Sequence, residues 1–315
     1  MPRPPETIVI VGTGGTIAGS ATTEGSHLEY RAGALSVQSL VDALPQLTGM
    51  PLEVQTLAQL DSSDMDHATW SALGLHLTAQ LARPEVKGLV VTHGTDTLEE
   101  TAYFVHRTVA AGKPVVFTAA MRPATAPSAD GPQNLIDALM VAGVDGARGV
   151  LAVLAGRVHA GAELRKLHGY RVDAFSSGDA GALAVIEDGN VRPFRPWPES
   201  QPAHATTLAI DPAHWPWVEI VTSHAGASGE LIRQLATAGV AGIVIAGTGN
   251  GSVHIALREA ASWAQQQGVV VWRSTRCLLG GVVGGAADAL HSAGALTPAQ
   301  ARVELMLSLA RPAAP

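Results

Sequence analysis

The sequence contains a single cysteine, Cys277, among its 315 residues. An intramolecular disulfide is therefore impossible, and a cysteine-rich zinc site cannot be built. None of the twelve histidines stands in an H-E-x-x-H arrangement, or at a spacing that would place two ligands beside an acid on one helical face. We therefore predict a protein that uses neither a metal nor a cofactor.

Basic runs and long apolar runs are also missing. Lys and Arg total 20 against 27 Asp and Glu, and no dense basic run is present to neutralise phosphates or anionic lipids. Gly, Asp or Arg interrupts each apolar stretch well before the roughly 20 residues that a membrane helix needs. Residues 1–6 show no signal-peptide pattern. We expect no nucleic acid and no membrane as partners and a cytoplasmic protein, or a periplasmic one if a signal peptide was removed.

The chain is 47% hydrophobic, which excludes a disordered or fibrous protein. Its length favours two domains. Short β-branched runs alternate with helical patterns, and this alternation is typical of right-handed βαβ units and mainly parallel sheets. The expected strands are Thr7–Val11, Gly88–Thr92, Pro114–Thr118, Gly149–Leu154, Val218–Thr222, Gly242–Ala246 and Val269–Arg273.

Two helices are expected in the first half of the chain. Apolar residues recur at helical spacing over residues 70–81, until Pro84 stops the pattern. A second helix is expected over residues 98–109. Thr97 with Glu100 three residues later predicts a capping box that opens this helix.

The chain changes character between residues 190 and 216, where six prolines replace the periodic apolar positions. We predict a linker at 191–216 between a larger N-terminal catalytic α/β domain at 1–190 and a smaller C-terminal α/β domain at 217–315. A final helix is expected over residues 298–309.

Two turns at the ends of predicted strands carry hydroxyl groups. In the first, residues 12–16, glycines let the backbone bend sharply and bring its N–H groups close to a ligand. A dinucleotide site is disfavoured because Ile17 stands where the third glycine of G-x-G-x-x-G would be. The second turn covers residues 93–97, in which Asp96 could simply favour the helix dipole. Because ligands of open α/β sheets bind at the carboxyl ends of strands, we expect the two turns to meet in one crevice.

These residues, taken in order, resemble the bacterial L-asparaginase family, whose members carry T-G-G-T-I-A-G and later T-H-G-T-D-T. The motifs stand here at Thr13–Gly19 and Thr92–Thr97. Shorter matches at Glu99–Phe104, Ala120–Pro123, Ser128–Pro132 and Gly249–Gly251 extend the resemblance over nearly the whole chain. The resemblance implies an enzyme that hydrolyses L-asparagine to L-aspartate and ammonia. It also implies a homo-oligomer, a dimer or tetramer, because the family builds its sites across subunit contacts.

The resemblance further implies two catalytic groups. One pairs Thr16 with Tyr30, the tyrosine of a mobile loop, and the other joins Thr95 to Asp96 and Lys166. A threonine hydroxyl is a poor nucleophile at neutral pH and must lose its proton as it attacks. We expect a double displacement through an acyl-enzyme, and the sequence does not decide which threonine attacks first.

Substrate recognition is likewise implied by the resemblance. Ser62 would bind the α-carboxylate and Asp96 the α-ammonium group, while N–H groups at Gly15 and near Thr95 would form the oxyanion hole. From its local sequence alone, Ser62 could instead be an ordinary turn residue. The full set of expected substrate-binding residues is Gly15, Ser62, Ser63, Thr95, Asp96 and Asn250.

The chain departs from the family's pattern at two places. Ser63 stands where members with high asparagine affinity often carry glutamine, which leaves the preference between asparagine and glutamine open. The segment 277–285 lacks the acidic residue that reaches a neighbouring subunit, and no acid follows until Asp288. Asn250 matches the family's intersubunit asparagine, although Asn beside Gly also suits a left-handed turn.

The sequence is also compatible with other interpretations. Lys166 could be a surface lysine in a loop, and His93 is expected to orient the Thr95 turn rather than to act as a base. The chain could prefer glutamine, serve as the amidase part of a tRNA amidotransferase with a partner chain, or bind an amino acid without turnover. The missing acid after Arg276 favours the last of these.

Overall fold

The computed structural model describes residues 6–22, 29–200, 202–284 and 290–310. The chain forms two compact units, Met1–Ala205 and Thr206–Pro315, and the division falls within the proline-rich stretch expected as a linker. The domain bounds drawn from the sequence stay a prediction. Within the described ranges, no helix combines the length and the apolar character that crossing a membrane requires.

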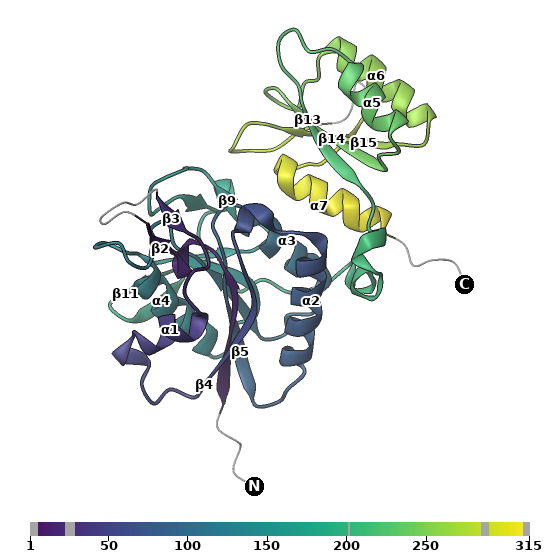
Figure 1. The fold of residues 1–315 in the computed structure, drawn as a ribbon. Helices are drawn as coiled ribbons and strands as arrows, with labels where there is room; N and C mark the ends of the chain where they lie inside the picture. The colour runs from purple at the N-terminus through teal and green to yellow at the C-terminus, as the bar shows by residue number, and fades with distance from the viewer. Residues whose placement is uncertain (1–5, 23–28, 201, 285–289, 311–315) are drawn as a thin grey trace. The chain divides into compact units, whose positions relative to one another are not determined.

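The larger unit is built on an eight-stranded sheet, shown in Figure 1. Its strands are β1 (Thr7–Gly14), β4 (Leu52–Leu60), β5 (Val86–Thr92), β6 (Pro114–Thr118), β7 (Gly149–Leu154), β8 (Arg157–Ala160), β11 (Ala184–Glu187) and β12 (Asn190–Pro193). Their order is β12-β11-β8-β7-β6-β5-β1-β4. The five strands from β7 to β4 are parallel, and β8, β11 and β12 add an antiparallel edge.

Four helices cover the two faces of this sheet: α1 (Val37–Asp42), α2 (His67–Leu81), α3 (Leu98–Thr108) and α4 (Gly131–Gly143). Helices α1 and α4 pack on one face, where Ile10 and Val116 join Leu139 of α4 in the core. Helices α2 and α3 lie against the other face (Figure 1). There Trp70 stacks on Phe104 with ring centroids 5.0 Å apart, which joins the two helices.

Short elements complete the larger unit. Two pairs of short strands lie outside the main sheet, β2 (Ser20–Ala21) with β3 (Tyr30–Arg31) and β9 (Arg165–Lys166) with β10 (Phe175–Ser176). Single 3-10 turns follow β1 and β4, namely η1 (Thr16–Ala18) and η3 (Ser62–Asp64).

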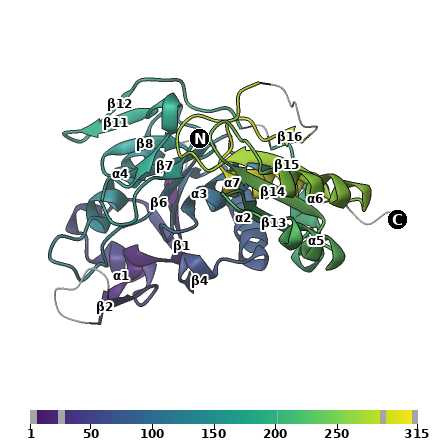
Figure 2. The ribbon, with the colours of Figure 1, turned by 90° about the horizontal axis from the view of Figure 1, so that it is seen from above.

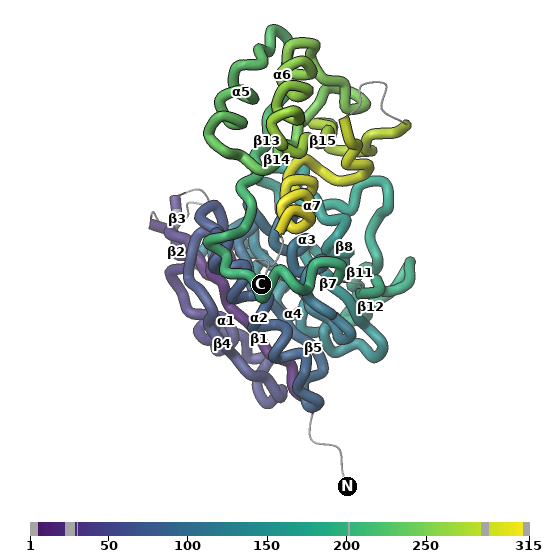
Figure 3. Tube along the Cα trace, turned by 90° about the vertical axis from the view of Figure 1, so that its right-hand side faces the viewer, coloured from purple at the N-terminus to yellow at the C-terminus, as the bar shows by residue number. Residues whose placement is uncertain are grey.

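The smaller unit repeats the α/β arrangement with the four parallel strands β13 (Val218–Thr222), β14 (Gly242–Gly247), β15 (Val270–Thr275) and β16 (His291–Ser292). Its helices are α5 (Glu230–Thr237), α6 (Ile255–Gln266) and α7 (Pro298–Leu309). Helices α5 and α6 lie side by side on one face, and α7 packs against the other (Figures 2 and 3). The α/β fold with mainly parallel sheets is therefore confirmed.

All seven expected strands are present, with ends that differ by at most three residues. Strand β4 was not predicted. It lies at the edge of the sheet, and none of its nine residues is fully buried, so it lacks the continuous apolar run of its neighbours.

The capping box predicted for α3 is wrong. The Thr97 side chain makes no capping hydrogen bond, and its hydroxyl instead donates to the Ser62 carbonyl at 2.8 Å. A capping box does open α7, where Thr297 and Gln300 exchange the two bonds.

Candidate functional site

Three turns meet at the carboxyl-terminal ends of the parallel strands of the large sheet. They follow the carboxyl ends of β4, β1 and β5, which are neighbouring parallel strands, and they carry Ser62, Thr16 and Thr95. The Thr13 hydroxyl donates to the Thr92 carbonyl at 2.9 Å and joins the ends of β1 and β5. The expected meeting of the two threonine turns therefore takes place where ligands of such sheets bind.

The backbones of the two threonine turns touch at Gly15 and Gly94. A Cβ atom at Gly15 would lie 2.3 Å from the Gly94 nitrogen, and Gly15 also has a φ of +81°. A Cβ atom at Gly94 would lie 2.4 Å from Ser62 Oγ. No side chain fits at either position without moving a turn, because real Cβ contacts are longer than 3 Å. Glycine at both positions allows the three turns to pack together.

Ser62 is bonded to the Thr95 turn through both its side chain and its main chain. Its Oγ accepts a hydrogen bond from the Asp96 N–H at 3.1 Å, and the residue is buried. Ser63 is exposed, and its hydroxyl donates to Asp61 Oδ1 at 3.0 Å. The structure thus brings Ser62 into the cluster and leaves Ser63 on the surface beside it.

Lys166 reaches the Thr95 turn from strand β9. Its Nζ donates to Thr95 Oγ1 at 3.0 Å and forms an ion pair with Asp96 Oδ1 at 2.5 Å. The lysine side chain is 17% exposed and the Asp96 side chain 58%. Lys166 is therefore not a free surface lysine, and these three side chains form one hydrogen-bonded row.

Glu99 also belongs to this cluster, although no sequence pattern indicates it. Its Oε2 accepts the backbone N–H of Lys166 at 2.8 Å. Burial raises the pKa of the Glu99 carboxyl, against the opposing effect of the hydrogen bond from Lys166. A carboxylate in the first turn of a helix is ordinary, because it favours the helix dipole. A partner 67 residues away leaves no local signal.

The structure places the backbone of Tyr30 but not its side chain, which lies outside the described part. Tyr30 pairs with Ala21 between β3 and β2. Three residues later, the Gly33 N–H donates to the Gly15 carbonyl at 3.1 Å, which attaches this segment to the Thr16 turn. Thr16 itself is buried at the start of η1. The pairing of Thr16 with Tyr30 stays a prediction.

Two family models match this chain. The asparaginase N-terminal model matches residues 7–199, and the glutaminase/asparaginase C-terminal domain model matches residues 217–315. The chain belongs to the asparaginase family.

Individual relatives agree with the family models. An L-asparaginase 2 of Bacillus subtilis is 37% identical, over 96% of this chain and 82% of the relative. A probable periplasmic L-asparaginase of Haemophilus influenzae is 37% identical, over 96% of this chain and 88% of the relative. The crystal structure of a probable cytoplasmic L-asparaginase from Campylobacter jejuni superposes with a TM-score of 0.91 at 36% identity, and it covers 96% of this chain and 95% of that one.

Asn250 lies in the smaller unit of this asparaginase. Its side-chain amide donates to the Val283 carbonyl and accepts the Val283 N–H, both at 2.7 Å. Asn250 therefore braces the segment in which the chain departs from its family. The left-handed turn suggested for Asn250 is wrong, because Gly249 and Gly251 take the positive φ angles there. Asp288 lies outside the described residues.

His93 is buried beneath the Thr95 turn of the asparaginase. Its Nδ1 lies 2.7 Å from the Gly94 carbonyl, so Nδ1 carries the proton of a neutral ring. Burial lowers the pKa of His93 to about 4. Within the described chain, Nε2 has no hydrogen-bond partner. The ring thus holds the Gly94 carbonyl and lies too deep to serve as a base for a substrate.

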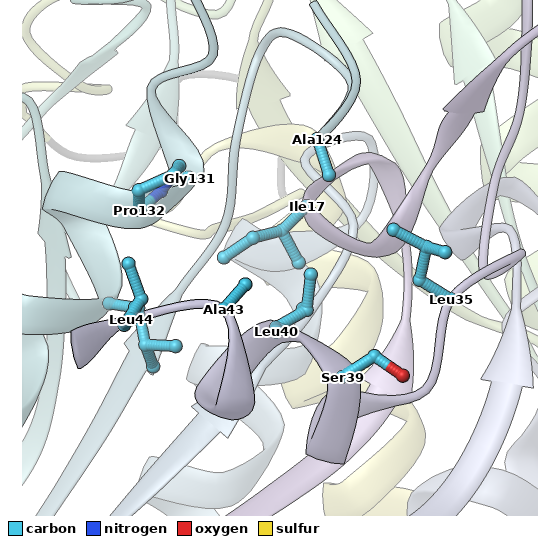
Figure 4. Close-up of a pocket in the computed structure, with 10 residues that line it drawn as sticks. Ile17, Leu35, Ser39, Leu40, Ala43, Leu44, Ala124, Gly131 and Pro132 are labelled. Atoms are coloured by element: carbon cyan, nitrogen blue, oxygen red, sulfur yellow. The ribbon is translucent and has the colours of Figure 1, made fainter. Parts of the chain in front are cut away.

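An apolar cavity of about 180 Å³ lies beside the Thr16 turn, and Figure 4 shows Ile17 directed into it toward Leu40 and Ala43. Apart from the Ser39 hydroxyl, the side chains that line it are apolar. None of the candidate catalytic or substrate-binding residues lines it. We therefore do not assign the polar substrate of an asparaginase to this cavity.

The contact between Gly15 and Gly94 leads to a first testable prediction. Gly15→Ala should lower the free energy of unfolding by roughly 2–5 kcal/mol, because the new Cβ is overpacked and the backbone is strained. Gly112→Ala is the matched control, since a Cβ there meets nothing within 4 Å. Urea unfolding of the two variants makes the comparison. Equal stability of both would contradict the described contact.

The buried His93 leads to a second prediction. Its pKa is about 4 in the folded chain against an ordinary 6.5, so protons bind preferentially to the unfolded chain between these values. The stability that a neutral His93 contributes is complete above pH 6.5 and should fall by on the order of 3 kcal/mol toward pH 4. The neutral, buried His159 adds an effect of the same sign. Urea unfolding at a series of pH values should show that the free energy of unfolding depends less steeply on pH in His93→Gln than in the wild type. The same pH dependence in both proteins would refute the assignment.

Proposed function

We propose that this asparaginase-family chain hydrolyses the side-chain amide of L-asparagine to L-aspartate and ammonia, with a threonine as nucleophile. The observation that carries the proposal is the 3.0 Å hydrogen bond between Lys166 Nζ and Thr95 Oγ1, with Asp96 paired to the same Nζ. A hydroxyl, a proton carrier and an orienting carboxylate then stand in one row, which is the arrangement that activates a weak nucleophile. The names of the relatives supply the substrate.

The reaction proceeds in two displacements. A threonine oxygen attacks the amide carbonyl carbon, and the C–N bond breaks to release ammonia. The hydroxyl proton reaches the departing nitrogen through the group paired with that threonine. For Thr95, Lys166 gives one ammonium proton to the nitrogen as it takes the hydroxyl proton, and for Thr16 the Tyr30 phenol performs the same exchange. Water then attacks the resulting ester, the threonine oxygen recovers a proton, and aspartate leaves. Backbone N–H groups at Gly15 and near Thr95 stabilise the oxyanion in both steps, and one such donor contributes about 10²- to 10³-fold in other enzymes.

Substrate binding uses the polar groups around this row. The Asp96 carboxylate pairs with Lys166 but stays 58% exposed, so it can also accept the α-ammonium group. Ser62 Oγ accepts the Asp96 N–H, which leaves the serine hydroxyl proton to donate to the α-carboxylate. We assign supporting contacts to the neighbouring Ser63 and, across a subunit contact, to Asn250.

Preference for glutamine is the second candidate. The C-terminal family model is named for glutaminase as well as asparaginase, and Ser63 is small and exposed where a longer side chain is common in members with high asparagine affinity. The ratio of kcat/KM for asparagine to that for glutamine decides between the two substrates. A ratio below one would replace asparagine in this proposal while leaving the reaction class intact.

We also propose a cytoplasmic homo-oligomer, a dimer or a tetramer. The Campylobacter structure is of a probable cytoplasmic enzyme, whereas the Haemophilus relative is a probable periplasmic one. Cell fractionation tests the location, and sedimentation velocity of the purified chain tests the assembly. A monomer with full activity would contradict a site completed by a second subunit.

Substitution of each threonine tests the mechanism. Thr16→Ala and Thr95→Ala should each lower kcat for ammonia release by roughly 10³-fold or more, because each removes a hydroxyl that acts within one catalytic unit. Tyr30→Phe should lower kcat as well, since the phenol hydroxyl is the proton carrier proposed for Thr16. Thr78→Ala is the control, because its hydroxyl donates to the Gly74 carbonyl within α2, away from the site.

Trapping the acyl-enzyme identifies the nucleophile. Rapid acid quenching during turnover, followed by peptide mass spectrometry, should place the aspartyl ester on the peptide that contains Thr16 or on the peptide that contains Thr95. Full ammonia release by both alanine variants would refute a threonine mechanism.

A further inference from the structure

The main chain of Lys166 is held by a carboxylate from the helix that follows the Thr95 turn. Glu99 is the second residue of α3, and its Oε2 accepts the Lys166 N–H at 2.8 Å. Figure 1 shows β9, which carries Lys166, next to the start of α3. The nucleophile candidate and the residue that anchors its lysine are therefore only four positions apart in sequence.

This contact closes a ring of covalent and hydrogen bonds that includes Thr95 and Lys166. One side of the ring is the chain from Thr95 to Glu99. The other side runs from the Lys166 N–H along the lysine side chain to Nζ, which donates back to Thr95 Oγ1 at 3.0 Å. The main-chain N–H and the side-chain Nζ of Lys166 thus both bond to residues of the short segment from Thr95 to Glu99.

Strand β9 itself is short. Strand β9 has two residues, and its pairing with β10 consists of Lys166 opposite Phe175 and Arg165 opposite Ser176. The next bond, from the Leu167 N–H to the Ala174 carbonyl at 2.7 Å, continues the same short hairpin. A lysine side chain has four flexible carbons, so the position of Nζ depends on where the main chain is held. A displacement of about 1 Å can cost about 10²-fold in rate.

We propose that Glu99 is a positioning residue, which fixes the main chain of Lys166 and so keeps its ammonium group against the Thr95 hydroxyl. The inference rests on the proposed roles of Thr95 and Lys166. Glu99 does not touch the Thr95 hydroxyl through any described bond, so its effect passes through the lysine. Glu99 contributes an acceptor oxygen that reaches the Lys166 N–H, and the negative charge of its carboxylate is not required.

Two substitutions separate reach from charge. Glu99→Gln keeps an acceptor oxygen at the same distance and removes the charge, so kcat should stay within roughly threefold of the wild type. Glu99→Asp keeps the charge and withdraws the oxygen by one methylene, so kcat should fall by roughly 10- to 100-fold with little change in KM. Glu100→Asp is the matched control on the adjacent position and should keep the wild-type kcat. A merely structural role would lower the thermal stability and the active fraction without this split between kcat and KM.

A double-mutant cycle tests whether Glu99 acts through Lys166. In a Lys166→Met background, Glu99→Asp should cause no further loss of kcat, because the ammonium group that it positions is already gone. A further tenfold loss in that background would overturn the inference, as would wild-type kcat in Glu99→Asp or a 100-fold loss in Glu99→Gln. If Glu99→Asp does not fold, Glu99→Leu takes its place, because leucine has a similar size and no acceptor. A fall in kcat of roughly 10-fold or more would then support the acceptor role, and wild-type kcat would overturn it.

The controls distinguish this inference from the proposed function. If the wild type releases no ammonia from asparagine or glutamine, the proposed function fails and takes the inference with it. If Lys166→Met lowers kcat while Glu99→Asp leaves it unchanged, the proposed function stands and the positioning role alone is refuted.

Discussion

Gly15 and Gly94 lie so close together that neither has room for a Cβ atom, and the whole site depends on this contact. Strands β1 and β5 are neighbours in a parallel sheet, which already brings their carboxyl ends within about 5 Å. The glycines allow the turns beyond those ends to stay in contact instead of diverging. Ser62, from the third strand end, then packs against Gly94 and bonds to the Asp96 N–H. The loss of backbone entropy at the glycines is offset by the close packing of three turns.

The parts of the fold that the sequence predicts well are those in which burial is continuous. The bounds of β6 and β7 agree residue for residue with the apolar runs, because all their residues are buried. Strand β4 was not predicted, because it is a partly exposed edge strand whose buried and exposed positions do not alternate regularly. The capping box predicted at Thr97 was wrong for a different reason. Its sequence pattern is that of a helix cap, yet the Ser62 carbonyl, 35 residues earlier in the chain, takes its hydroxyl. A local pattern carries no information about such a competitor.

The same division applies to the site. Thr16 and Thr95 could be chosen from glycine-rich turns after strands, a feature that physical reasoning connects to ligand binding. Lys166 was accessible only through the family resemblance, because it lies in a two-residue strand 71 residues from Thr95. Glu99 was accessible through neither. Its carboxylate looks like a routine partner of the helix dipole, and only the folded chain shows that it bonds the Lys166 N–H.

The start of α3 therefore holds several of the candidate site residues, and the packing of the helix explains how they are kept in place. Asp96 and Glu99 both lie near the positive end of the helix dipole, which would also stabilise the oxyanion that the proposed mechanism places near Thr95. The helix is fixed from behind, because Phe104 stacks on Trp70 and the Trp70 indole donates to the Thr101 hydroxyl at 2.9 Å. Donors and charges on such a helix need no reorganisation when charge develops in the reaction. Glu99 accepts the Lys166 N–H, and Thr95 accepts a hydrogen bond from Nζ, so both ends of the lysine are held at the start of this helix. The position of the ammonium group therefore depends on the packing of α3 in the core of the domain more than on the short hairpin that carries Lys166.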